Sequence, residues 1–533
     1  MAMIFSSVLA DVTVVVATCL VAAYLYFASI FRYWKRRGVH YIPPTSMFGN
    51  LGGVALQREH IGEYLKKVYD SNPDQPVVGL FAFRKPILMV RDLDVVQSVM
   101  VKNAHAFLDR PVNISQESNP LASRSLFALK GKKWRLLRTK LTPTFTSAKI
   151  KKMFYLVNEC GKQLLPCIEK EMEKGKHVMV KDTVARYSTD VIASCAFGVD
   201  GKALVDPNSE FRATTRKIFE RTKLQDLALN LITLAPSLIR ALRLKITDES
   251  INNYLRKLFW EVVDHRKKNN VSRNDFVDIL MQLKDEGQVR AEEDAHDKEE
   301  IKQDSENMDI KKLRIEAIDL KLEDDDFVAQ AFIFIGAGYE TSSSVIAFTL
   351  YELALNPSIQ DKLRRKLMTV LEKHNSEVTY EAIAEMDYLE MVISETLRKH
   401  PTVPILARQC LEDFRIPGTD ITIEKGTSVM IPVLAIHSDP AIYPEPDKFD
   451  PERFNHENKN KRSKFAHIPF GEGPRICIGM RFGQMQVKTA LVHILTTYQV
   501  RPCAETPTPP LRLKPTGVNT PRKEIALAFD RIN

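Results

Sequence analysis

Phe470-Gly-Glu-Gly-Pro-Arg-Ile-Cys-Ile-Gly479 is the stretch that decides how this 533-residue chain is interpreted. The two glycines before the cysteine permit a tight loop whose backbone can come close to a flat ligand. A helical pattern begins three residues after Cys477, so the thiol stands at a helix N-terminus, where unpaired N–H groups and the dipole favour thiolate. Phe470 can pack beside the sulfur and exclude water, and Arg475 can reach an anionic group of a cofactor.

The alternative interpretation of Cys477 is a buried cysteine without chemistry, which is the common fate of free cysteines. However, the loop combines Phe, Arg, Cys and three Gly at fixed offsets, a chance match with a probability below about 10⁻⁴ at average residue usage. The chain has seven scattered cysteines and no Cys-x-x-Cys pair, which argues against a disulfide framework and a structural zinc site and suits a reducing compartment. Cys477 is therefore predicted to be a metal ligand.

Most of the remaining chain has helical periodicity. The acidic run Asp324–Asp326 suits the positive end of a helix dipole and begins a helix that is predicted to reach Asn356, before Pro357. At 1.5 Å per residue this helix is roughly 45–50 Å long. Its first half is apolar on nearly all sides, which is typical of a helix at the centre of a large domain.

A second helix is predicted to begin at Asp387, with Glu390 as its capping-box partner, and to stop at Pro401. The segment 285–323 lacks aromatic residues and is rich in Asp, Glu and Lys, so it is expected to be a solvated loop with local helix. Short strands are predicted at 77–83, 87–90, 421–423 and 428–432. The fold class is therefore mainly α with a minor β-sheet portion.

Val12–Phe31 is a run of twenty residues without a charge, long enough to cross a membrane as a helix. The basic residues that follow it keep the rest of the chain cytoplasmic by the positive-inside rule, and Tyr33 and Trp34 are expected at the membrane interface. A cleaved signal peptide would have its charges before the apolar run. The expected division is an anchor at 1–31, a basic and proline-containing hinge at 32–50, and one large domain at 51–533.

The overall composition excludes one class of partner. The chain is 44% hydrophobic, enough for a large core, and its 76 basic and 67 acidic residues give a formal net charge of +9. This mild excess suits an anionic membrane surface or an acidic protein partner. Nucleic-acid binding would need basic residues interleaved with aromatics in a groove-reading element, and no such motif occurs.

The cysteine stretch resembles the haem-binding loop of the cytochrome P-450 superfamily. Further segments resemble that family in order and spacing: Trp134-Arg-Leu-Leu-Arg138, Ala337-Gly-Tyr-Glu-Thr341, Glu395-Thr-Leu-Arg398 and Pro451-Glu-Arg453-Phe454. The resemblance covers essentially the whole chain, and it implies a cytochrome P-450 fold with one haem domain, haem b as the cofactor and Cys477 as the axial ligand of the iron.

The resemblance implies that Glu340 and Thr341 deliver protons to iron-bound oxygen, because O–O cleavage needs protons at a buried site. Gly338 is expected to let the helix open locally and free carbonyl groups to hold water. Without the surrounding motif, the expected role of Thr341 is a hydrogen bond from its hydroxyl to a carbonyl of its own helix.

Glu395 and Arg398 could form a surface ion pair at (i, i+3). The mostly apolar character of their helix instead favours a buried structural pair, with Arg453 as a third member.

The resemblance also implies that basic residues bind the haem propionates. The residues concerned are Trp134 and Arg138, which lie one helical turn apart, together with Arg408 and Arg110. A solvated basic helix remains the alternative for the 130–140 region. Basic residues there and at 459–464 suggest a positive face for an acidic, flavin-containing NADPH reductase, with cytochrome b5 as a further candidate partner; such charge would speed encounter.

Substrate contacts are expected from 107–126, from 332–341 and from 402–405, in particular from Gly336, Ala337, Thr402 and Ile405. Gly336 stands where close relatives often carry a bulkier residue, which predicts extra room above the iron. The motif forms are most like the microsomal group of insect detoxification and vertebrate drug-metabolising enzymes. That resemblance implies lipophilic substrates such as plant toxins or insecticides, with an endogenous hormone or pheromone as the other option.

The predicted function is insertion of one atom of O₂ into a lipophilic substrate, with NADPH electrons arriving through the reductase, at the endoplasmic reticulum membrane with a single anchor. One rival is a haem-thiolate isomerase or dehydratase, which would have no need of Glu340 and Thr341. The other is a membrane-tethered haem sensor or carrier without enzymatic activity.

Overall fold

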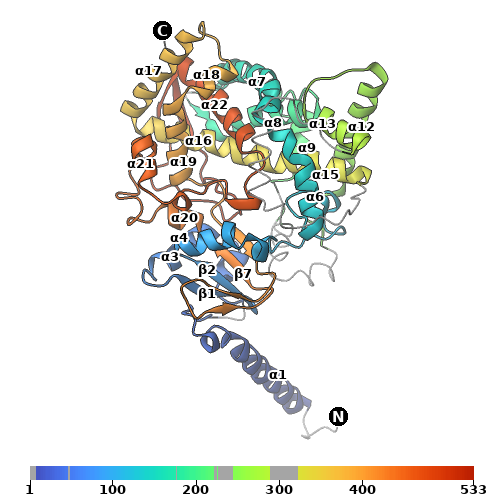
Figure 1. The fold of residues 1–533 in the computed structure, drawn as a ribbon, viewed down its shortest axis with the longest axis vertical. Helices are drawn as coiled ribbons and strands as arrows, with labels where there is room; N and C mark the ends of the chain where they lie inside the picture. Colours follow the sequence, from blue (N-terminus) through green and yellow to red (C-terminus); the bar gives the residue numbers. More distant parts are fainter. Residues whose placement is uncertain are drawn as a thin grey trace.

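The computed structural model describes residues 8–45, 48–175, 177–220, 222, 225, 244–287 and 322–532. A large helical body lies above a small sheet, and helix α1 (Val8–Phe31) extends from the sheet end of the molecule (Figure 1). The predicted solvated loop at 285–323 falls mostly outside the described residues; its first two residues belong to helix α13 (Phe276–Glu286). The prediction of a mainly α fold with a minor sheet is confirmed.

The centre of the body is one long apolar helix, as predicted. It consists of α15 (Asp324–Phe334), a π-helical turn η6 (Ile335–Tyr339) and α16 (Glu340–Leu355). A capping box between Glu323 and Asp326 starts it, and α17 (Pro357–Lys373) begins directly after Asn356. Although it is apolar and long enough to cross a membrane, this helix is largely buried, so it serves as the core of the body.

Three further helices pack against α16: α8 (Val180–Ile192), α19 (Asp387–Lys399) and α22 (Met480–Thr497), and α7 (Ser147–Lys174) covers α8 and α22. Helix α7 can approach α22 closely because of Gly161, where a Cβ would lie 2.5 Å from the His493 ring.

The predicted capping box of α19 is wrong. Met386 occupies its N-cap without a side-chain hydrogen bond, and Glu390 instead pairs with Lys488 of α22.

The remaining helices are short or lie at the periphery of the body. They are α2 (Gly52–Ala55), α3 (Ile61–Asp70), α4 (Leu93–Gln97), α5 (Pro120–Arg124), α6 (Gly131–Leu141), α9 (Glu210–Arg216), α12 (Glu249–Asn269), α18 (Tyr380–Ala384), α20 (Val433–His437) and α21 (His456–Asn460).

The main sheet has the strand order β1-β2-β7-β4, from β1 (Val77–Ala82), β2 (Lys85–Val90), β7 (Ser428–Ile431) and β4 (Leu406–Gln409). Strand β7 runs parallel to β2 and antiparallel to β4, which brings chain segments separated by more than 300 residues together. In one small sheet β9 (Ala526–Arg531) lies between β3 (Val178–Met179) and β8 (Tyr498–Pro502) and is antiparallel to both. In the other, β5 (Phe414–Arg415) pairs with β6 (Thr422–Ile423).

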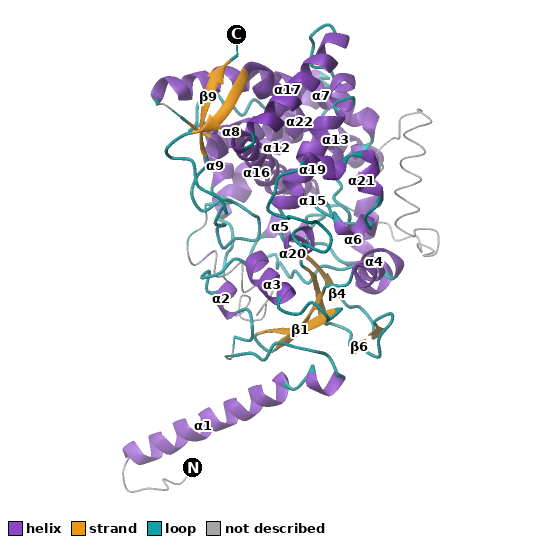
Figure 2. Cartoon of the chain, turned by 90° about the vertical axis from the view of Figure 1, so that its left-hand side faces the viewer, coloured by secondary structure: helices purple, strands orange, loops and turns teal. Residues whose placement is uncertain are grey.

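The segment after α1 is fixed to the sheet. The Ile42 N–H donates to the Gly79 carbonyl of β1 at 3.0 Å, and the Gly79 N–H donates back to His40 at 2.8 Å. Trp34, expected at a membrane interface, is fully buried, because its ring covers Gly79 and its indole N–H donates to the Leu80 carbonyl. Figure 2 shows α1 leaving the body beside β1.

Candidate active site

The loop that carries Cys477 is built on two glycines with positive φ. Gly471 and Gly473 have φ of +75° and +70°, a region that side chains rarely adopt. At Gly473 a Cβ would also lie 1.9 Å from the Met100 carbonyl oxygen, so no larger residue fits. The Cys477 N–H donates to the Phe470 carbonyl at 3.0 Å, which closes the loop.

The Cys477 sulfur sits at the N-terminal end of α22, as the sequence predicts. Burial raises the pKa of the thiol, and the Gly479 backbone N–H together with Arg138 and Arg110 acts in the opposite direction. Cys477 lies within the body, which accounts for this effect of burial, but its side chain faces open space and is accessible, while Arg475 two residues earlier is buried. The sulfur is therefore free to bond to a ligand, and the nearby positive charges favour an anionic form of it.

Arg475 joins this loop to the segment around Asp109 and to α6. Its guanidinium donates to the Leu108 carbonyl at 2.8 Å and to the Leu129 carbonyl at 2.9 Å, and it lies 3.3 Å from the Asp109 carboxylate. It also lies 3.7 Å from the centroid of the Trp134 ring. One of its terminal nitrogens, Nη1, is buried without a hydrogen-bond partner, which leaves a donor for an anion.

Arg110 and Arg408 complete a cluster of positive charge with Arg138 and Arg475. Burial, and then repulsion from Arg110, lowers the pKa of Arg408 to about 9. Burial, Arg110 and Arg408 likewise lower the pKa of Arg475 to about 8, opposed by Asp109. In the described part of the chain, Asp109 is the carboxylate that pairs with this cluster. Burying like charges side by side is costly, so the lowered pKa values of Arg110, Arg408 and Arg475 fit a ligand that carries carboxylates.

The long helix opens next to the Ala337–Thr341 motif, in agreement with the role expected of Gly338. The opening is the π-helical turn η6. Gly338 has a packing reason as well, because a Cβ there would lie 2.5 Å from Ile192 Cδ1 of α8. The Thr341 hydroxyl donates to the Ala337 carbonyl, the local bond that was the alternative to a catalytic role. Ala337 itself is exposed within this buried helix.

Glu340 has partners that the sequence did not indicate. Its Oε1 atom lies 3.2 Å from Lys181 Nζ of α8 and accepts a hydrogen bond from the Thr520 hydroxyl at 3.0 Å. Lys181 also donates to the Ser343 hydroxyl at 2.6 Å, and burial lowers its pKa against the opposing effect of Glu340. Lys181 and Thr520 stand about 160 and 180 residues from Glu340, and no local pattern marks them.

Glu395 and Arg398 form a fully buried pair on α19, joined at 2.7 and 2.9 Å. Arg453 approaches Glu395 to 3.5 Å, and the Asp450 N–H donates to the same carboxylate at 2.9 Å. Arg398 also donates to the His437 and Pro446 carbonyls. This arrangement ties α19 to the segment that precedes the cysteine loop.

The residues expected to contact substrate fall into two groups. Gly336 lies in η6 with nothing within 4 Å of a Cβ, so there is open space beside it and beside the exposed Ala337. Thr402 is buried, with its carbonyl bonded to the Asn519 N–H, and Ile405 packs against the sheet-side core.

One kind of cofactor suits both parts of this site, the Cys477 sulfur and the cluster of arginines. It needs a metal for the sulfur and carboxylates for the arginines, and haem b combines an iron with two propionates. The fold and the site therefore define a haem-thiolate protein.

Comparison with known proteins agrees with this class. The sequence model of the cytochrome P450 family matches residues 40–529, so the chain belongs to the cytochrome P450 family. It is 44% identical to cytochrome P450 6j1 and 42% identical to cytochrome P450 6k1 of Blattella germanica, over 95% and 94% of this chain and 94% and 93% of those proteins. Cytochrome P450 6B6 of Helicoverpa armigera is 36% identical, over 92% of both chains. The protein is a cytochrome P450 monooxygenase that is similar to insect members of the family, with haem b as its cofactor and NADPH as the electron source through a reductase.

Proposed function

We propose that this cytochrome P450 oxidises lipophilic foreign compounds, such as plant toxins or insecticides, from a membrane-anchored position at the endoplasmic reticulum. Its division would be an anchor at 1–31, a hinge at 32–50 and the haem domain at 51–533. The observation that carries the chemistry is the exposed Cys477 sulfur beside a cluster of arginines. The open space at Gly336 supports bulky substrates.

Each site residue has a specific task in this proposal. Bound haem would supply oxygen activation, which electron density from a thiolate ligand would promote. Cys477 provides that thiolate, and Phe470 limits water at the sulfur. Arg110, Arg138, Arg408 and Arg475, with Trp134, hold and neutralise the propionates. Glu395, Arg398 and Arg453 keep the cysteine loop in position.

Proton delivery is assigned to the π-helical opening. The Thr341 hydroxyl holds its proton on the Ala337 carbonyl and can pass it on. The Glu340 carboxylate, held by Lys181 and Thr520, is the proposed second member of this relay. Lys181 is a positioning residue in this scheme, because it acts through Glu340.

The apolar helix near the N-terminus supports the membrane location. An 18-residue window within Ala10–Arg37 has a mean hydropathy of 2.2, and none of that window is buried by the body. The basic residues after it support a cytoplasmic position of the haem domain, by the positive-inside rule. Lys459, Lys461 and Lys464 are exposed and form the proposed docking face for the reductase.

The test is turnover by the full chain reconstituted in lipid with NADPH–cytochrome P450 reductase and a panel of lipophilic compounds. We expect NADPH and O₂ consumption that rises with substrate and yields products with one added oxygen atom. Conversion without reductase would indicate an isomerase or dehydratase, and haem binding without any turnover would indicate a sensor or carrier. Turnover of a single hormone-like compound alone would contradict the foreign-compound proposal.

A further inference from the structure

A polar cavity of about 370 Å³ lies between the segment after α1 and the edge of the main sheet, outside the site described above. Its walls come from the segment after α1, the start of β2, the loop before α5, the residue before α6, strand β4, and the turn before β7 with the first residue of that strand. The lining residues are Tyr33, Lys85, Pro86, Pro111, Asn113, Lys130, Gln409, Glu424, Lys425, Gly426, Thr427 and Ser428.

The cavity is positively charged. Three of its lining residues are lysines, and its one acidic residue, Glu424, is already paired with Arg37. Burial lowers the pKa of Lys130, with Asp109 opposing and Arg475 adding to the effect. Burial, Arg84 and Lys130 lower the pKa of Lys85. An anion bound between the ammonium groups of Lys85 and Lys130 would offset the cost of their burial and reduce the repulsion between them.

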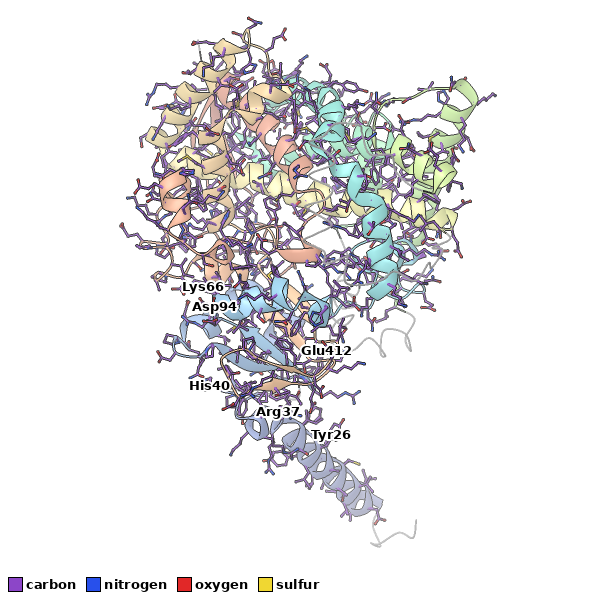
Figure 3. The ribbon with its side chains drawn as sticks, in the orientation of Figure 1. Tyr26, Arg37, His40, Lys66, Asp94 and Glu412 are labelled. Atoms are coloured by element: carbon purple, nitrogen blue, oxygen red, sulfur yellow. The ribbon has the colours of Figure 1, made fainter. Side chains whose placement is uncertain are left out.

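The cavity also lies at the membrane end of the molecule. Tyr33 stands two residues after the end of α1, and its hydroxyl is 3.4 Å from the Thr427 hydroxyl on the opposite wall. Arg37 covers the Tyr33 ring at 3.7 Å, and Arg84 donates to the Tyr26 hydroxyl of α1 at 3.2 Å. Figure 3 shows Arg37 at the junction between α1 and the sheet, with Tyr26 further along α1. These contacts hold the cavity next to the point where α1 leaves the body.

We propose that this cavity binds the phosphate-bearing headgroup of an anionic glycerophospholipid from the membrane in which α1 is embedded. Lys85, Lys130 and Lys425 neutralise the phosphate, and the hydroxyls of Tyr33, Thr427 and Ser428 with the amides of Asn113 and Gln409 bond its oxygens. Cavities of this size hold small ligands, and anionic lipids are common in cytoplasmic leaflets. The proposal rests on the membrane anchor for the source of the ligand, but not on the reaction.

The test uses native mass spectrometry of the full-length protein, released from phosphatidylcholine nanodiscs that contain some phosphatidic acid. The quantity measured is the number of phosphatidic acid molecules that remain bound to the protein. The variant is Lys85→Gln with Lys425→Gln. The matched control, Lys35→Gln with Arg36→Gln, removes two exposed charges from the segment directly after α1 that do not line the cavity. We expect one retained phosphatidic acid in the wild type and the control, and about tenfold or greater loss of affinity in the variant, because it removes two charge-assisted hydrogen bonds to the phosphate.

An equal loss in the control would show general surface attraction and overturn the proposal. A second measurement adds soluble dihexanoyl-phosphatidic acid or inorganic phosphate to protein in pure phosphatidylcholine nanodiscs and follows the melting temperature. Stabilisation by the short lipid alone supports the proposal, whereas equal stabilisation by inorganic phosphate would indicate a small-anion site and overturn it. Equal melting temperatures of all variants without ligand establish that they fold.

If the chain does not enter nanodiscs and still binds the short lipid in detergent, the proposal of a membrane anchor is wrong and the proposal of a lipid-binding cavity stands.

Discussion

Cys477 and the surrounding arginines depend on each other electrostatically. Burial disfavours the thiolate, and Arg110 and Arg138 favour it. The same burial disfavours the charged arginines, and anions beside them restore their usual protonation. A haem with an iron and two carboxylates therefore stabilises both sets of groups at once, which explains why so much uncompensated charge is tolerated inside one fold.

We predict that Cys477→Ala abolishes the thiolate ligand. The purified variant should lose the carbon monoxide difference spectrum of a haem-thiolate protein and all NADPH-dependent turnover, because alanine offers no ligand to iron. Cys503→Ala, which removes a half-buried cysteine in another region, is the control and should keep both. An unaltered carbonyl spectrum in Cys477→Ala would refute the assignment of the ligand.

We predict that the fold loses stability in acid through its buried histidines. Burial lowers the pKa of His493 to about 4 and that of His467 to about 3. Below pH 6.5 the unfolded chain takes up protons that the folded chain does not, so stability falls as pH drops toward 4, by about 1.4 kcal/mol per pH unit for each such histidine. Above pH 6.5 both states are neutral at these sites and the effect disappears.

His493→Gln tests this prediction, because an amide can still bond Asn158, the present partner of His493 at 2.8 Å. The free energy of unfolding, measured in denaturant between pH 6.5 and 4.5, should fall less steeply in the variant by the contribution of one proton. An identical dependence of the unfolding free energy on pH in both proteins would mean that His493 takes up its proton as readily in the folded state as in the unfolded state.

At the scale of elements, the sequence predicted the parts that follow local rules. The acidic start of α15, the stop before Pro357 and the strands β1, β2 and β7 of the main sheet lie where the pattern put them. Strand β4 (Leu406–Gln409) of the same sheet was not predicted, and the strand predicted at 421–423 belongs to a separate small sheet. The capping box at Asp387 was wrong, because a tertiary contact replaced it: Glu390 pairs with Lys488. The packing of Trp34 on Gly79 was not foreseen, and the depth of Trp34 in the membrane stays a prediction. Lys181 was also missed, since its partner Glu340 is distant in the chain.

We predict that Gly338→Ala destabilises the contact between the central helix and α8. The new methyl group would lie 2.5 Å from Ile192 Cδ1, and overpacking of this kind costs about 1–3 kcal/mol. Ile192→Val removes that Cδ1 atom, so the double variant should regain much of the loss. Thermal unfolding of the four proteins gives the coupling energy, and strictly additive effects would contradict the predicted clash.

We predict that Gly336→Phe narrows the range of substrates. Space is open at the Cβ position, so the ring can be accommodated without a backbone clash and should occupy room used by large substrates. Turnover of the largest compounds in a size-graded panel should fall about tenfold or more, on the scale of the free energy lost when a bulky group no longer fits, while small compounds are retained. Unchanged size limits would place Gly336 outside the substrate space.

At the scale of the whole molecule, its two ends have different tasks. Helix α1 and the sheet lie at one end, and the helical body that carries the cysteine loop lies at the other (Figure 1). The segment after α1 pairs with β1, so the anchor is continuous with the sheet and the haem domain is held in a defined orientation to the proposed membrane. The exposed lysines around α21 are then available to a partner from the cytoplasm.

We predict that Lys459→Glu with Lys464→Glu weakens coupling to the reductase. Reversing two exposed charges on the proposed docking face should raise the reductase concentration needed for half-maximal turnover about tenfold at low salt, because complementary charge speeds encounter. The difference should shrink at high salt, where exposed charges are screened. Lys257→Glu with Lys268→Glu makes the same charge change on α12, on the opposite side of the body from α21, and should have little effect (Figure 1). If both pairs weaken coupling equally, net charge and not this face governs the encounter, and the docking assignment fails.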